Sequence, residues 1–229
     1  MRRKVSKLKH GVFQRTAETS TGELITAGFY NLTIGVVLCW GFLVNWLMVR
    51  WIPMDSILSI HPLVFLLAYF ACAMAGVWIF SRSEKPLVSF LGFNLVVVPF
   101  GFVINVVVAQ YDSSVVIEAI GITGLVTFLM MGAGSLLPAF FERIGRALGV
   151  VLLIVIVVEF SAIFVFGLDR NVIDWIIAIV FCGYIGYDWV RANRIPKTLD
   201  NAVDSAAALY IDIVNLFLRI LRILGRRRR

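Results

Sequence analysis

The chain has 229 residues, of which 60% are apolar and only 15% are charged. Soluble domains typically carry roughly 25% charged residues, and here the charges are also gathered between long apolar runs. This pattern is typical of a chain that lies in lipid, and it excludes an ordinary soluble domain. The length fits one membrane domain without a separate soluble domain.

The net charge of +7 comes mainly from the two ends of the chain. Lys and Arg are frequent up to Arg15, and Arg226–Arg229 form an unbroken basic run. Basic segments beside apolar spans typically contact anionic lipid headgroups or set the topology of the protein. Aromatic residues are not interleaved with these charges, so we expect membrane lipid, and no nucleic acid, as their partner.

Seven apolar segments are each close to the ~20 residues that a helix needs to cross the hydrocarbon. The turns between them are short, which favours antiparallel neighbours. We therefore predict an all-α, polytopic membrane protein with a cytosolic basic arm at residues 1–26, a membrane domain at 27–225 and a basic tail at 226–229. The expected spans are 29–49, 59–80, 87–109, 115–137, 148–167, 172–190 and 205–224.

The seventh segment is less apolar than the others because it contains Asp212, Asn215, Arg219 and Arg222. Exposure of these polar residues to lipid would be energetically costly. We expect this segment to lie inside the bundle, where the other helices shield it.

Alternate loops are basic, which indicates the orientation in the membrane. The turns at 82–85 and 142–146 and the loop at 191–197 are rich in Lys and Arg, whereas those at 111–114 and 168–171 are nearly free of them. The N-terminus is therefore expected in the cytosol, and the compact chain without a retrieval signal favours a bacterial plasma membrane over the endoplasmic reticulum. Seven crossings would place the basic tail outside, against the rule, unless the last helix re-enters and returns.

Several polar residues within the spans have structural interpretations. We expect Asn45, Asn94 and Asn105 to form hydrogen bonds between helices, and His61, which precedes a proline, to cap a helix. The sequence contains no Ser–His–Asp set, HExxH motif or Gly-rich phosphate loop. We therefore expect neither an enzyme nor a bound cofactor.

Four acids lie within the predicted spans, and two of them are isolated. Glu118 is near the outer end of its span and can reach the interface. Glu159 is in the middle of its span without a local partner, so it must be protonated, paired or facing water. It is equally compatible with a functional acid and with a neutral hydrogen-bonding group. Glu118, Glu159 and Asn215 are secondary candidate sites.

The other two acids, Asp188 and Asp212, are 24 residues apart with a polar loop midway between them. In an antiparallel helical hairpin, this spacing places both carboxyl groups at a similar depth, near the cytosolic side. Two carboxylates close together in a poorly hydrated site cannot both ionise cheaply, so they would share a proton and form a proton-sensitive latch. The alternative is that each acid pairs separately with an arginine, among Arg191, Arg219 and Arg222.

These residues lie in two distinctive segments: residues 183–188 read GYIGYD, and residues 208–225 read ALYIDIVNLFLRILRILG. Both segments closely resemble the end of the Bax inhibitor-1 (transmembrane Bax inhibitor motif) family. The YIDxxNLF core, with YD at the right distance upstream, is a specific signal. The number of earlier spans, their basic turns and the IEA sequence at 117–119 agree with it.

The resemblance implies a seven-helix fold in which the C-terminal helix is central and wrapped by the other six. It also implies a pH-sensitive calcium leak channel with Asp188 and Asp212 as the aspartate pair. Arg82 is the nearest match to an arginine that interacts with this pair. A short polar pair is common after the Tyr-Asp of the family, but Trp189–Val190 stand there in this chain, which suggests a drier or differently gated rim.

Three functional hypotheses follow. The first is a proton-gated Ca2+ leak, in which the carboxyl oxygens of Asp188 and Asp212 are ligands for the transported ion. The second is a non-conducting regulator whose basic tails bind another membrane protein, such as a quality-control protease or a death-pathway factor. The third is a proton-coupled transporter that uses Glu159 as a relay.

Overall fold

The computed structural model describes residues 23–161 and 170–227, and the side chains of residues 23–158 and 172–227. All of its regular elements in these ranges are helices. One of them, α2, has five residues, and the others have 21 or more. The helices are α1 (Ala27–Trp51), α2 (Met54–Leu58), α3 (Pro62–Arg82), α4 (Pro86–Val108), α5 (Ser113–Leu136), α6 (Pro138–Ser161), α7 (Arg170–Arg194) and α8 (Leu199–Arg227).

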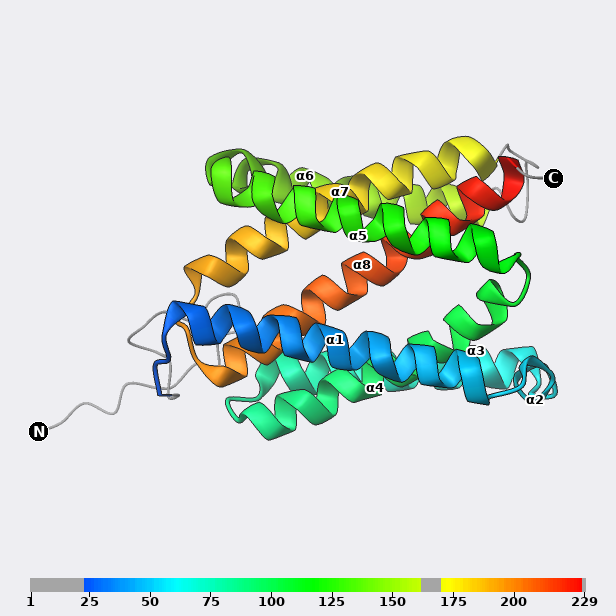
Figure 1. Cartoon of the computed structure of the whole chain (residues 1–229), viewed down its shortest axis with the longest axis horizontal. Coiled ribbons are helices and arrows are strands. Elements are labelled where there is room, and N and C mark those ends of the chain that lie inside the picture. Colours follow the sequence, from blue (N-terminus) through cyan, green and yellow to red (C-terminus); the bar gives the residue numbers. More distant parts are fainter. Residues whose placement is uncertain (1–22, 162–169, 228–229) are drawn as a thin grey trace, which may run out of the picture.

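Two groups of helices lie on either side of α8 (Figure 1). Helices α1, α3 and α4 pack together on one side, and α5, α6 and α7 on the other. Helix α8 contacts α1 and α4 in the first group and α5 and α7 in the second. The longest of the described helices therefore joins the two groups.

Helix α8 is covered by protein on every side along its first turns. The eight consecutive residues Asp200–Ala207 are all buried, and a run of eight residues passes twice around a helix of 3.6 residues per turn. The helix begins at Leu199, six residues before the predicted boundary at 205. The polar side chains of these first turns, among them Asp200 and Asp204, are thus shielded from lipid by the neighbouring helices, which lowers the cost of placing them in the bundle.

The outer helices expose large apolar side chains, as expected for contact with hydrocarbon. In α3 only Gly76 and Phe80 are buried, whereas Leu67, Phe70 and Met74 are exposed. Among the described residues, five helices are long and apolar enough to cross a membrane: α1, α3, α4, α5 and the Val172–Arg194 part of α7. These helices support an integral, multi-pass membrane protein.

Two further predicted boundaries were wrong. Glu142, Arg143 and Arg146 were expected in a connection, but they lie within α6, which begins at Pro138. Proline is favourable at the first position of a helix because the missing N–H would have no partner there, so the helix starts before its charged residues. The predicted second span at 59–80 is preceded by the separate helix α2, and α3 begins at Pro62.

The asparagines within the spans join helices, as predicted. The Asn45 amide donates to the Val97 carbonyl oxygen at 3.1 Å, and the Tyr210 hydroxyl donates to Asn45 Oδ1 at 2.5 Å. Asn45 thereby links α1 to both α4 and α8. The indole N–H of Trp40 donates to Asn94 Oδ1 at 3.0 Å.

The remaining polar residues of this group also have the predicted roles. The Asn105 amide lies 3.0 Å from the Met48 carbonyl oxygen and 2.9 Å from that of Ile52, so it binds α4 to the end of α1. His61 caps α3, because its Nδ1 accepts a hydrogen bond from the Leu63 amide at 3.3 Å. Both contacts satisfy polar groups that lipid could not.

Helices α3 and α4 approach each other closely at two glycines. A Cβ atom added at Gly76 would lie 2.5 Å from the carbonyl oxygen of Gly92, and one added at Gly92 would lie 2.9 Å from that of Gly76. Small residues at such crossings allow backbones in a membrane to pack against each other. The two glycines therefore set the distance between α3 and α4.

We predict that Gly76→Ala destabilises the protein by about 1–3 kcal/mol, the usual cost of overpacking, because the obstructing atom belongs to the backbone. Thermal unfolding in detergent measures this effect. Gly121→Ala is the matched control, since a Cβ atom at Gly121 meets nothing within 4 Å. Equal unfolding temperatures for the two variants would show that this crossing does not limit the packing.

Candidate functional site

Asp188 and Asp212 meet in the interface between α7 and α8. Asp188 lies six residues before the end of α7, and Asp212 is near the middle of α8. Their relative exposures are 9% and 6%, and their carboxyl groups are within hydrogen-bonding distance of each other. The structure thus brings together the two acids that the sequence places at a similar depth.

Arg191 is the cation beside this pair. It follows Asp188 by almost one helical turn, and its Nη1 lies 3.3 Å from Asp188 Oδ1. The guanidinium also lies over the ring of Tyr187, 4.9 Å from the ring centroid. Although Arg191 was one of the arginines considered for separate pairing, its contact with Asp188 leaves the two carboxyl groups together.

The charges of this cluster limit its states. With both carboxylates ionised, the pair and Arg191 carry a net charge of −1, and one proton makes the cluster neutral. Asp212 Oδ2 is buried and makes no hydrogen bond within the described part of the chain. A buried charged oxygen without a donor is costly. The arrangement can therefore take up a proton or a cation.

The structure gives this site two carboxylates as candidate metal ligands. Within residues 23–158 and 172–227, no three or more side chains of His, Cys, Asp or Glu come together in a way that could hold a metal ion. A Ca2+ ion at Asp188 and Asp212 would complete its six to eight oxygen ligands with water or carbonyl groups.

The other predicted site residues lie elsewhere. Arg82 ends α3, which packs chiefly against α4, and its guanidinium lies over the Trp78 ring, 5.1 Å from the centroid. The Asn215 amide donates to the Ile211 carbonyl oxygen of its own helix at 2.8 Å. Glu118 is exposed on α5. Glu159 belongs to α6, and its side chain lies outside the described residues.

The glycines of the GYIGYD segment serve packing. A Cβ atom at Gly186 would clash with the ring of Phe141, and one at Gly183 would lie 2.7 Å from Leu148 Cδ2. Conversely, a Cβ atom at Gly145 of α6 would clash with the Tyr187 ring. These residues let α6 pack closely against α7, so α6 supports the helix that carries Asp188.

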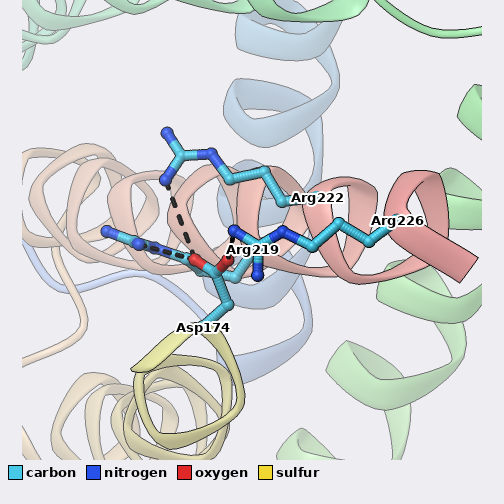
Figure 2. Close-up of polar contacts among 4 residues, drawn as sticks. All are labelled: Asp174, Arg219, Arg222 and Arg226. Atoms are coloured by element: carbon cyan, nitrogen blue, oxygen red, sulfur yellow. Dashed lines mark hydrogen bonds and ion pairs between the residues drawn. The ribbon is translucent and has the colours of Figure 1, made fainter. Parts of the chain in front are cut away.

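A second charged cluster, which sequence analysis missed, lies toward the other end of the same interface (Figure 2). Asp174, only 2% exposed, forms ion pairs with arginines from three successive turns at the end of α8. Its Oδ1 is 2.8 Å from Arg219 Nη1 and 3.8 Å from Arg222 Nη1, and its Oδ2 is 2.8 Å from Arg226 Nη2.

A signal for this cluster was present in the sequence. Asp174 precedes Asp188 by 14 residues, and Arg226 follows Asp212 by the same number. In an antiparallel hairpin, the register that joins Asp188 to Asp212 therefore also joins Asp174 to Arg226. The alternative of separate pairing correctly expected ion pairs for Arg219 and Arg222. Their partner, however, is Asp174 and not Asp188 or Asp212.

The loop between α7 and α8 is held by Tyr30 of α1. The buried Tyr30 hydroxyl lies 2.9 Å from the Ala192 carbonyl oxygen, 3.3 Å from that of Asn201 and 2.9 Å from Ser205 Oγ. On the neighbouring side, Ser89 Oγ of α4 donates to Asp200 Oδ1 at 2.7 Å. These bonds fix the loop that sets the hairpin register.

The fold and the site define a multi-pass helical membrane protein with a buried carboxyl pair in its last hairpin. The protein-family model described as "Inhibitor of apoptosis-promoting Bax1" matches residues 24–229. The chain belongs to this family, the Bax inhibitor-1 family, as its last two segments indicated.

Relatives occur in plants and bacteria. The chain is 32% identical over 183 residues to a BI1-like protein of Arabidopsis thaliana, with 75% of this chain and 69% of that protein covered. It is 29% identical over 153 residues to an uncharacterized protein of Helicobacter pylori strain J99, and it spans 64% of that protein's length. An uncharacterized membrane protein of Streptococcus pyogenes is 28% identical over 133 residues, covering 55% of this chain and 58% of that protein.

We predict that Tyr30→Phe lowers the stability by about 1–2 kcal/mol, because a buried hydroxyl is lost while its partners stay in place. Thermal unfolding in detergent measures the change. Tyr69→Phe is the control, because the Tyr69 ring packs on Phe70 and Phe100 and its hydroxyl makes no hydrogen bond within the described residues. A larger loss for Tyr69→Phe would contradict the role of Tyr30.

Proposed function

We propose that the protein is a pH-sensitive Ca2+ leak channel of the Bax inhibitor-1 type, with Asp188 and Asp212 as its proton sensor. The observation that supports this function best is the contact of two buried carboxyl groups in the interface between the last two helices. A well-packed apolar pair would stabilise this interface better than two buried acids do, so the acids point to a function.

The pair responds to protons through its charge. With one proton, the two carboxyl groups hydrogen-bond and hold α7 against α8. Without it, two like charges share one guanidinium, and their repulsion favours separation of the helices. Ca2+ prefers the same carboxylate oxygens as ligands, so the ion competes with the proton for the pair.

The helices must move apart for an ion to pass. Ile177 and Ile185 of α7 and Leu216 and Leu221 of α8 are at most 2% exposed and belong to one apolar cluster. Packed apolar side chains leave no hydrated route for a divalent ion. This arrangement represents the closed channel, and opening requires α7 to separate from α8.

For the membrane topology, we propose seven crossings, with α6 and α8 added to the five apolar spans and α8 central among the other helices. The start of α1, the turn after α3, the α5–α6 junction and the α7–α8 loop lie at one end of the bundle (Figure 1). These segments include the basic turns, which supports a cytosolic N-terminus. We place the protein in a bacterial plasma membrane.

Asp212→Asn is expected to abolish the pH dependence of Ca2+ flux, because the carboxamide keeps the size and hydrogen bonding of the side chain but cannot ionise. The measurement is Ca2+ flux into liposomes that contain the purified protein, titrated against pH. Glu118→Gln, which removes an exposed acid of α5, should leave the titration unchanged. An unchanged titration in Asp212→Asn would reject this sensor.

Arg191→Gln should shift the pH dependence of the flux to higher pH, because the ionised pair loses the guanidinium that stabilises it. Arg82→Gln tests the latch that the family resemblance implies. Contact with Asp188 favours Arg191 as the main counter-charge. If the shift occurred only in Arg82→Gln, the counter-charge would belong to Arg82.

The second candidate is a non-conducting regulator that binds another membrane protein, such as a quality-control protease or a death-pathway factor. It is favoured by the family's description as an inhibitor of apoptosis-promoting Bax1. The same liposome assay separates the two functions, because a regulator would show no Ca2+ flux at any pH.

A further inference from the structure

Asp174 and its arginines hold α7 to α8 at the end of the hairpin opposite the aspartate pair. Asp174 and Asp188 are 14 residues apart on α7, which is about 21 Å along a helix at 1.5 Å per residue. Fourteen residues are also close to four full turns, so both acids project from nearly the same face of α7. Two charged contacts therefore lie at the two ends of one interface.

The contacts at the two ends act on the hairpin in opposite senses. The carboxyl pair repels when both of its members are ionised. At the other end, opposite charges attract, since arginine stays protonated at any physiological pH and two guanidinium nitrogens lie 2.8 Å from the Asp174 oxygens. Parting of α7 and α8 along their whole length requires that this second contact break.

We propose that Asp174 and Arg226 form an electrostatic clamp that opposes the parting of α7 and α8 and so determines the conductance of the leak. This inference deepens the proposed function and rests on it. The clamp adds a second determinant to the proton sensor: the sensor sets the pH at which the helices repel, and the clamp sets how readily they separate.

The graded exposure of the arginines indicates where the clamp releases. The Arg219 side chain is 15% exposed, whereas that of Arg226 is 38% exposed. A guanidinium that leaves a partly exposed ion pair regains water at little cost. Arg226 therefore dissociates from Asp174 first, while the more buried Arg219 still neutralises the carboxylate. Full separation of α7 from α8 breaks the Arg219 contact as well.

The test compares Arg226→Gln and Asp174→Asn with Arg50→Gln in the full-length protein. Arg50 is exposed in the last turn of α1, and Arg226 lies in the last turn of α8. Helices α1 and α8 end at the same end of the bundle (Figure 1), so removal of Arg50 changes the charge there without touching the clamp. Two properties are measured: hydrogen–deuterium exchange of the α7 amides in detergent, and Ca2+ flux into liposomes at one fixed pH.

We expect both clamp variants to increase α7 exchange and Ca2+ flux about fivefold, at the lower end of typical coupling between sites. The double variant should conduct no more than Asp174→Asn alone, because that change already removes the charged partner of Arg226. Arg50→Gln should match the wild type. Size-exclusion chromatography shows whether each variant is folded and monodisperse, so a loss of flux that comes from misfolding is recognised.

Unchanged exchange and flux in folded Arg226→Gln and Asp174→Asn would overturn the clamp, and so would a decrease in flux. If the wild type conducted no Ca2+ at any pH, the proposed channel function would fail instead. The exchange measurement would then still decide whether the Asp174–Arg226 contact limits the separation of α7 from α8.

Discussion

Carboxyl groups buried in a bundle that is itself surrounded by lipid must be neutralised, and this requirement shapes the last hairpin. Asp174 is neutralised by arginines from α8, whereas Arg191 contacts Asp188 of the carboxyl pair. Water is not available in hydrocarbon to solvate an unpaired charge. Helix α8 can therefore carry these charges only because helices of both groups cover it, and the packing of α1, α4, α5 and α7 against it follows from that constraint.

The carboxyl pair and the arginine cluster both consist of charged side chains, but they differ in the balance of acids and guanidinium groups. Asp174 lies among the guanidinium groups of Arg219, Arg222 and Arg226, so opposite charges attract at this end of the hairpin. Two acids beside a single guanidinium have two charge states, −1 and neutral, which differ by one proton. In the proposed channel, the carboxyl pair is the part of the hairpin that responds to pH, and the arginine cluster is the part that resists separation of the helices.

Much of the architecture could be predicted from the sequence, because lipid contact leaves a strong signal in composition and length. The helical class, the main apolar spans and the structural roles of Asn45 and Asn105 followed from it. The meeting of Asp188 with Asp212 followed from hairpin symmetry. The start of α6 was missed, because charged residues at a helix end look the same as charged residues in a turn. Asp174 was missed because its partners lie 45 to 52 residues away, where only the tertiary register connects them.

The two charged contacts are separated by the same number of residues on α7 and on α8, so both can form in one helix register. An extra residue inserted in one helix between its two charges would rotate one end by about 100° and shift it by about 1.5 Å, so one contact could form only if the other were lost. An insertion of the same size in the partner helix would be needed to restore both. Both contacts can form only while the 14-residue intervals from Asp174 to Asp188 and from Asp212 to Arg226 stay equal.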